Sequence, residues 1–220
     1  MTQQDRQLDR DELGIKSHVI QLYKEVDKAL GVAIDCLLGC DTETARFVVS
    51  NDKMINRMQH QIEEVCVTTI ARQQPMAKDL RDLISNIAIA GELERIGDYA
   101  AGIADIVLKL NEKPHPDFVG GIEALGQECR NMLTSVMQSY EDLDETGARS
   151  VAAEEEKIDQ GEKRLISTIF SYLNDNPRDI EAGTYALWIV HSIERVGDRV
   201  TNIAERVVYM ASGKMVDLNT

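Results

Sequence analysis

The segment DLRDLISNIAIAGELERIGDYAAGIADIVLKL, at residues 79–110, decides the fold because it recurs one hundred residues later. Residues 179–210 read DIEAGTYALWIVHSIERVGDRVTNIAERVVYM, and the two segments align without a gap. The string LERIGD of the first copy returns as IERVGD in the second. Self-similarity at a fixed offset is the sequence signature of a duplicated structural unit. The chain is therefore predicted to contain two related units.

Both copies carry the apolar spacing of an amphipathic helix. Apolar residues recur every three or four positions, which places them along one face of a helix. In the first copy this stripe is formed by Ile89, Leu93, Ile96, Ala100, Ile103 and Val107, and in the second by Ile189, Ile193, Val196, Val200, Ile203 and Val207. We expect these two stripes to be part of the hydrophobic core.

The rest of the chain is also typical of helices, and strand signals such as alternating β-branched runs with Asn-Gly turns are missing. The four prolines lie at predicted helix boundaries, where they are tolerated. We predict an all-α protein with helices at about 8–38, 42–73, 76–110, 117–143, 147–174 and 178–211. Three long helices joined by short loops pack as an antiparallel bundle. The proline-containing loop between the third and fourth predicted helices divides the chain into two three-helix bundles, residues 1–111 and 117–220.

Composition excludes several classes of function. The chain has 220 residues and a net charge of −14, which disfavours binding to nucleic acid and favours cations or basic partners. It has no apolar run of the length that a membrane helix needs and begins with a polar segment, unlike a secretory signal. The four cysteines match no zinc or disulfide spacing, so we expect free thiols in a reducing cytosol. Cys36 and Cys40 share a helix face, but burial as small apolar residues is favoured over a soft-metal site.

Pairs of acidic residues mark the face opposite each apolar stripe. Glu94 and Asp98 are four residues apart, as are Glu194 and Asp198, so each pair projects from successive turns of its helix. The preceding helix of each unit carries a similar pair, which is Asp52 and Asn56 in the first unit and Glu155 and Asp159 in the second. Like charges at this spacing repel one another, and a hard cation turns the repulsion into attraction. The alternative is a solvated acidic face without metal.

Glycine at positions 97 and 197 is unusual in the middle of a helix, where it costs about 1 kcal/mol relative to alanine. Its recurrence in both units indicates that a neighbouring helix approaches closely on that side. We therefore expect the second and third helices of each unit to bring their oxygen-bearing side chains together.

These strings resemble the PhoU family of phosphate-uptake regulators. The resemblance is carried by RQQPMAKDLR (72–81), GELERIGDYAAGIA (91–104) and IERVGDRVTNIAE (193–205), and it extends to NDKMIN (51–56) and EEEKID (154–159). It covers nearly the whole chain. The doubled ExxxD motif on a proline-led helix is its most specific part.

The resemblance implies a cytoplasmic homodimer of two tandem three-helix bundles, with no membrane insertion of its own. It implies multinuclear metal clusters on carboxylates, with iron or zinc as the metals and magnesium or manganese as alternatives. It further implies a non-enzymatic regulator that links the ATPase of the Pst phosphate transporter to a PhoR-type sensor histidine kinase and represses the phosphate-starvation response. The family's metal-binding positions correspond here to Glu94, Asp98, Glu194 and Asp198, and less directly to Asp52, Asn56, Glu155 and Asp159.

The two units differ at several of these positions. Asn202 is a further candidate metal ligand in the second unit, whereas the first unit has Gly102 there. Asn56 offers a neutral oxygen where the second unit has Asp159, so we expect the first site to be the weaker one. His191, three residues before Glu194, is either an additional ligand for zinc or iron or a surface histidine.

Two alternatives have other functions. A di-iron enzyme of the ferritin type needs two ExxH motifs on inward-facing helices, and the single ExxH, from Glu112 to His115, lies in the proline-containing loop. Motifs for nucleophilic hydrolysis and for nucleotide binding are missing as well. A metal-free scaffold whose acidic faces dock a basic partner remains the second candidate.

Overall fold

The structure, a computed structural model, describes residues 3–110 and 115–218, and it is all-α over these ranges, as predicted. The elements are α1 (Gln3–Gly39), α2 (Thr42–Gln73), α3 (Ala77–Lys109), α4 (Pro116–Asp142), α5 (Glu145–Ala152), α6 (Glu155–Asp175), the 3₁₀ turn η1 (Pro177–Asp179) and α7 (Ile180–Ser212). Residues 111–114 of the predicted inter-unit loop lie outside the described residues. None of the described helices has a stretch long and apolar enough to span a membrane.

Local sequence explains where the helices break. Asp41 caps α2, because its side chain accepts hydrogen bonds from the backbone amides of Glu43 and Thr44, both at 3.1 Å. At the other end of α2, Gln74 adopts a left-handed conformation and donates its amide to the carbonyl of Ile70, and a proline follows. The short connections make successive helices antiparallel neighbours.

The prediction of a single continuous helix at 147–174 is wrong. The segment 147–174 is two helices rather than one, since α5 ends at Ala152 and α6 begins at Glu155. Asp144 caps α5 by accepting from the amide of Thr146, so this short helix also starts earlier than predicted. The break places Glu155 and Glu156 in the first turn of α6, where the positive end of the helix dipole favours carboxylates.

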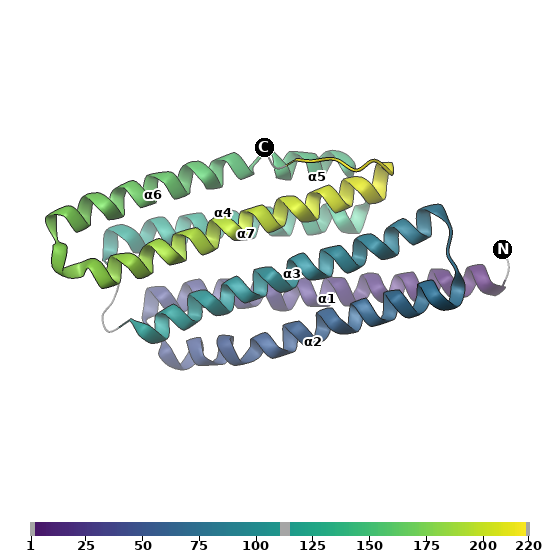
Figure 1. The fold of residues 1–220 in the computed structure, drawn as a ribbon, viewed down its shortest axis with the longest axis horizontal. Coiled ribbons are helices and arrows are strands. Elements are labelled where there is room, and N and C mark those ends of the chain that lie inside the picture. The colour runs from purple at the N-terminus through teal and green to yellow at the C-terminus, as the bar shows by residue number, and fades with distance from the viewer. Residues whose placement is uncertain (1–2, 111–114, 219–220) are drawn as a thin grey trace.

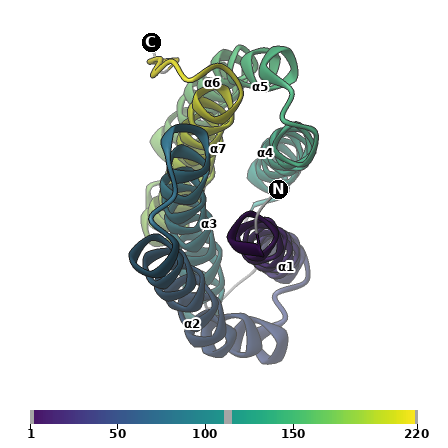
Figure 2. The ribbon, with the colours of Figure 1, turned by 90° about the vertical axis from the view of Figure 1, so that its right-hand side faces the viewer.

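The two units pack side by side as a two-layered molecule (Figures 1 and 2). One layer holds α2, α3, α7 and α6 in that order, so the third helices of the two units are neighbours at its centre. The other layer holds α1 and α4, which cover the inner face of the first, and α5 packs against α4 and α7. The predicted site residues therefore all lie on helices of the four-helix layer.

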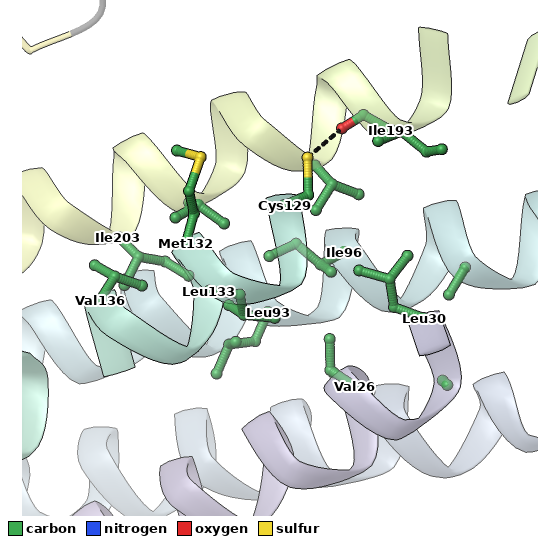
Figure 3. Packing of buried hydrophobic residues seen from close by; sticks show 14 of the residues in the cluster. Val26, Leu30, Leu93, Ile96, Cys129, Met132, Leu133, Val136, Ile193 and Ile203 are labelled. Atoms are coloured by element: carbon green, nitrogen blue, oxygen red, sulfur yellow. Dashed lines mark hydrogen bonds between the residues drawn. The ribbon is translucent and has the colours of Figure 1, made fainter. Parts of the chain in front are cut away.

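Both units contribute to one continuous hydrophobic core. Figure 3 shows Leu93 of α3 together with Leu133 of α4 and Ile193 of α7, and both predicted apolar stripes are fully buried. Cys129 is buried at the same place, and its thiol donates to the carbonyl of Ile193 at 3.4 Å. The four cysteines are free thiols, and Cys36, Cys66 and Cys129 are buried as small apolar residues.

Polar contacts also join the units. Arg130 of α4 makes a two-pronged ion pair with Asp27 of α1, with distances of 2.9 and 3.0 Å. The hydroxyl of Tyr140, buried at the end of α4, donates to the side-chain carbonyl of Asn86 on α3. Such bonds fix the register of the two units because breaking one leaves a partly or fully buried polar group unpaired.

Candidate functional site

The side chains of Asp52, Asn56, Glu94 and Asp98 form a first cluster, in which α2 meets α3. Gly97 of α3 allows the two helices to approach each other closely. A Cβ atom at this position would lie 3.0 Å from Cγ2 of Ile55 on α2. Real Cβ atoms rarely come so close to a neighbour, so glycine sets the distance between the helices. The close approach predicted from the two glycines is confirmed here.

The carboxylates of the first cluster act on one another electrostatically. The pKa of Glu94 is raised by burial and then by the charges of Asp98 and Asp52, and Arg95 and His60 only partly oppose this. The pKa of Asp98 is likewise raised, by burial and by Asp52. Three acidic groups from two helices thus share a small volume.

The side chains of Glu155, Asp159, Glu194 and Asp198 form a second cluster, in which α6 meets α7. Gly197 is its close-contact residue, and a Cβ atom there would lie 3.3 Å from Ile158. The pKa of Glu155 is raised by burial, by Asp159 and by the two acidic groups of α7. The pKa of Asp198 is raised by burial and by Glu194, against the opposing charges of Arg195 and Arg199. The structure therefore brings the predicted residues together in both units.

The clusters differ in their internal counterions. Arg195 makes ion pairs with the two acidic groups that α7 contributes to the second cluster, at 2.5 Å from its Nε atom to Glu194 and at 2.8 Å from Nη1 to Asp198. The equivalent Arg95 instead pairs with Glu92, at 3.3 Å, one turn away from the first cluster. The second cluster is therefore partly neutralised by ion pairs within the chain, whereas Arg95 and His60 act on the first cluster without a direct ion pair among the described residues.

A bridge across the centre of the layer connects the two units. Glu92 of α3 accepts from Arg199 at 3.3 Å and from the side-chain amide of Asn202 at 3.1 Å. Arg199 also lies 3.7 Å from Asp198 of the second cluster. Asn202, one of the predicted site residues, thus contacts the other unit.

The donor set fits a metal ion in chemical terms. In the first cluster, atom Oδ1 of Asp52 is buried and has no hydrogen-bond partner among the described residues, while its other carboxylate oxygen accepts from Asn56 at 3.1 Å. An orphaned carboxylate oxygen beside two further carboxylates is a costly arrangement without a cation. Carboxylate and amide oxygens are the ligands that hard divalent ions bind. The residues present therefore suit a cation.

Sequence reasoning missed one acidic residue, Glu162. It lies on α6 next to His191 and Glu194 of α7, and one ligand atom from each of the three lies within 4.8 Å of the others. Its position, three residues after Asp159, continues the acidic face of α6, and this spacing is the signal from which it was predictable.

We expect Gly97→Leu to lower the free energy of unfolding by about 2 kcal/mol, because the new side chain must push α2 away from α3. Gly102→Leu is the matched control on the same helix. A Cβ atom at Gly102 meets nothing within 4 Å, so leucine there should raise stability by roughly 0.7 kcal/mol through helix propensity. Urea titrations followed by circular dichroism measure both changes. Equal effects of the two substitutions would contradict the close approach at Gly97.

The fold and the clusters together define a class of protein, a duplicated three-helix bundle with one carboxylate cluster in each unit. The PhoU domain model matches the chain twice, over residues 19–107 and 122–207. The chain belongs to the PhoU family.

Individual relatives agree with this assignment. The chain is 30% identical to the phosphate-specific transport system accessory protein PhoU homolog of Clostridium acetobutylicum, over all of both chains. It is 32% identical to the phosphate-specific transport system accessory protein PhoU of Escherichia coli strain K12, over 91% of this chain and 83% of the relative. The crystal structure of PhoU from Pseudomonas aeruginosa superposes with a TM-score of 0.90 at 31% identity, covering 94% of this chain and 99% of that one.

Proposed function

We propose that this protein is a non-enzymatic regulator of phosphate uptake that represses the phosphate-starvation response when phosphate is plentiful. The observation that carries the proposal is the match to PhoU across both units, with relatives named as accessory proteins of phosphate-specific transport systems. In this role the protein works in the cytoplasm as a homodimer. Its partners are the ATPase of a Pst-type phosphate transporter and a PhoR-type sensor histidine kinase.

Metal binding is the second part of the proposal. The first and second clusters each hold a multinuclear metal site, with iron or zinc as the favoured metals. The orphaned oxygen of Asp52 and the raised pKa values of Glu94, Asp98 and Glu155 support it, because a bound cation offsets the repulsion among these groups. Bound ions would supply positive charge and open coordination positions to a surface that is otherwise acidic.

A series of ion pairs connects the second cluster to the first unit. Glu92 holds Arg199, and Arg199 contacts Asp198 of the second cluster. A change in the charge of the second cluster therefore alters the ion pairs between α3 and α7. This contact lies at the centre of the four-helix layer, between the two clusters.

The regulatory role is tested by deleting the gene in its host and following a phosphate-starvation reporter in phosphate-rich medium. We expect the deletion to switch the reporter on, and the wild-type gene to switch it off again. A variant carrying Glu94→Gln, Asp98→Asn, Glu194→Gln and Asp198→Asn should not restore repression. The control variant, with Glu63→Gln and Glu64→Gln on the exposed side of α2, should restore it. A reporter that stays off in the deletion strain would refute the regulatory role.

The alternative, a metal-free scaffold that docks a basic partner through the same acidic groups, is favoured by the net charge of −14. Metal content per chain, measured by plasma mass spectrometry on untagged protein purified without chelator, separates the two. Metal that is bound to the wild type and lost in the four-residue variant supports the clusters as metal sites. Metal-free wild type would leave the docking function as the explanation.

A further inference from the structure

Glu162, His191 and Glu194 form a compact group at the edge of the second cluster, on the facing sides of α6 and α7. The Nδ1 atom of His191 lies 3.4 Å from Oε1 of Glu162 and 3.6 Å from Oε2 of Glu194. Both separations are longer than the usual 2.9–3.0 Å of a direct N–H···O hydrogen bond. The imidazole therefore makes one long hydrogen bond, to Glu162, and a longer ion-pair contact with Glu194.

The same separations suit a shared metal ion. Zinc binds histidine nitrogen and carboxylate oxygen at about 2.0–2.2 Å, so two ligands of a tetrahedral ion lie roughly 3.4 Å apart. The distances from His191 to the two carboxylate oxygens are close to that value. The group is thus arranged for coordination with small side-chain movements.

Burial makes a cation at this place favourable. The side chain of Glu162 is 15% exposed and that of Glu194 is 8% exposed, so two carboxylates are held together mostly out of water. The pKa of Glu162 is raised by burial and by Glu194, and His191 only partly opposes this. Arg195 already contacts Oε2 of Glu194, so an incoming ion must share or displace that contact. His191 itself is 61% exposed, which leaves the site open to solvent on one side.

The first unit does not repeat this group. The helix-three position equivalent to His191 is Gly91, and a Cβ atom there has nothing within 4 Å. Ile55 and Ile158 occupy equivalent positions on the second helices, because each packs on the glycine of its own unit. With this alignment, the residue of the first unit that is equivalent to Glu162 is Gln59. Gln59 donates to Glu63, at 3.2 Å, on its own helix. The position of His191 therefore has no nitrogen ligand in the first unit, where the histidine that acts on Glu94 is His60 of α2.

We propose that Glu162, His191 and Glu194 bind a transition-metal ion of the zinc type at the edge of the second cluster. Imidazole favours zinc, iron, nickel and copper over magnesium, calcium and manganese, whereas an all-oxygen site suits the latter. The inference rests on the proposed function, because Glu194 also belongs to the second cluster. It adds Glu162 and His191 as ligands to those of the second cluster.

The test uses the full-length protein stripped of metal, with Co²⁺ as a spectroscopic probe and Zn²⁺ in competition with a coloured chelator. The wild type should show the visible absorption of tetrahedral cobalt with a nitrogen ligand and bind Zn²⁺ tightly. His191→Ala and Glu162→Gln should each weaken Zn²⁺ binding by at least about tenfold, the lower end of the losses seen even for supporting residues of metal sites. The cobalt spectrum of His191→Ala should change in intensity and position.

Glu181→Gln is the matched control, because Glu181 is an exposed carboxylate in the first turn of the same helix, about 15 Å along α7 from His191. It should leave Zn²⁺ affinity and the cobalt spectrum unchanged. An unchanged Zn²⁺ affinity in folded His191→Ala, checked by circular dichroism, would overturn the inference even if metal still bound to the carboxylate clusters. Zn²⁺ binding that survives Glu94→Gln and Asp98→Asn but is lost in His191→Ala would support it, whatever the fate of the first cluster.

Discussion

Replacing Leu93 by alanine should lower the free energy of unfolding by about 3 kcal/mol, the middle of the range for leucine truncation in a packed core. Leu93 is fully buried on α3, beside Leu133 of α4 (Figure 3). The lost methyl groups leave a cavity at the place where the two units meet. Because both units share this core, we expect them to lose stability together in one unfolding transition.

The matched control is Leu13→Ala, since the side chain of Leu13 on α1 is 68% exposed. It should change stability by less than about 0.5 kcal/mol. Both variants are measured by urea titration with circular dichroism, in chelator so that metal does not contribute. Two separate transitions, with only the first unit affected by Leu93→Ala, would show that the units do not share a core.

The sequence was enough to predict the helices, the duplicated unit and the carboxylate pairs, because each depends on residues close together in the chain. Helical periodicity identifies the face of Leu93 or Ile193, and the repeated glycine indicates where another helix comes near. The break between α5 and α6 was missed, because Ala153 and Glu154 carry no proline or glycine. The order of the helices within the four-helix layer could not be predicted either, because the sequence does not specify which helices of the two units become neighbours.

The different roles of two equivalent arginines illustrate this limit. Arg95 and Arg195 occupy the same position of the repeated motif, yet they have different partners. In the first unit Glu92 lies one turn earlier and attracts Arg95, whereas the second unit has Ser192 there, and Arg195 turns to Glu194 instead. One substitution outside the motif thus decides whether the cluster contains its own counterion. That the first site is the weaker one stays a prediction, and the missing counterion there argues against it.

Neutralising the first cluster should have opposite effects on stability with and without metal. In chelator, Glu94→Gln with Asp98→Asn should stabilise the protein by roughly 0.5 kcal/mol, because like charges four residues apart on a helix repel each other. The folded-state pKa values of both groups are raised, so they cost stability at neutral pH. As the pH falls through those values the folded wild type takes up protons before the unfolded chain does, and the advantage of the variant should disappear.

With a bound divalent ion the order should reverse. A ligand at one hundred times its dissociation constant stabilises the folded state by about 2.7 kcal/mol, and the variant should lose most of that gain at its first cluster. Thermal melting in chelator and in excess Zn²⁺ or Fe²⁺ measures both states, with Glu63→Gln and Glu64→Gln as a control that removes the same charge from the exposed side of α2. The control should respond to metal as the wild type does. If the variant with the neutralised cluster gained as much from metal as the wild type, the ions would bind elsewhere, and the acidic residues of the first cluster would have to act as a docking surface.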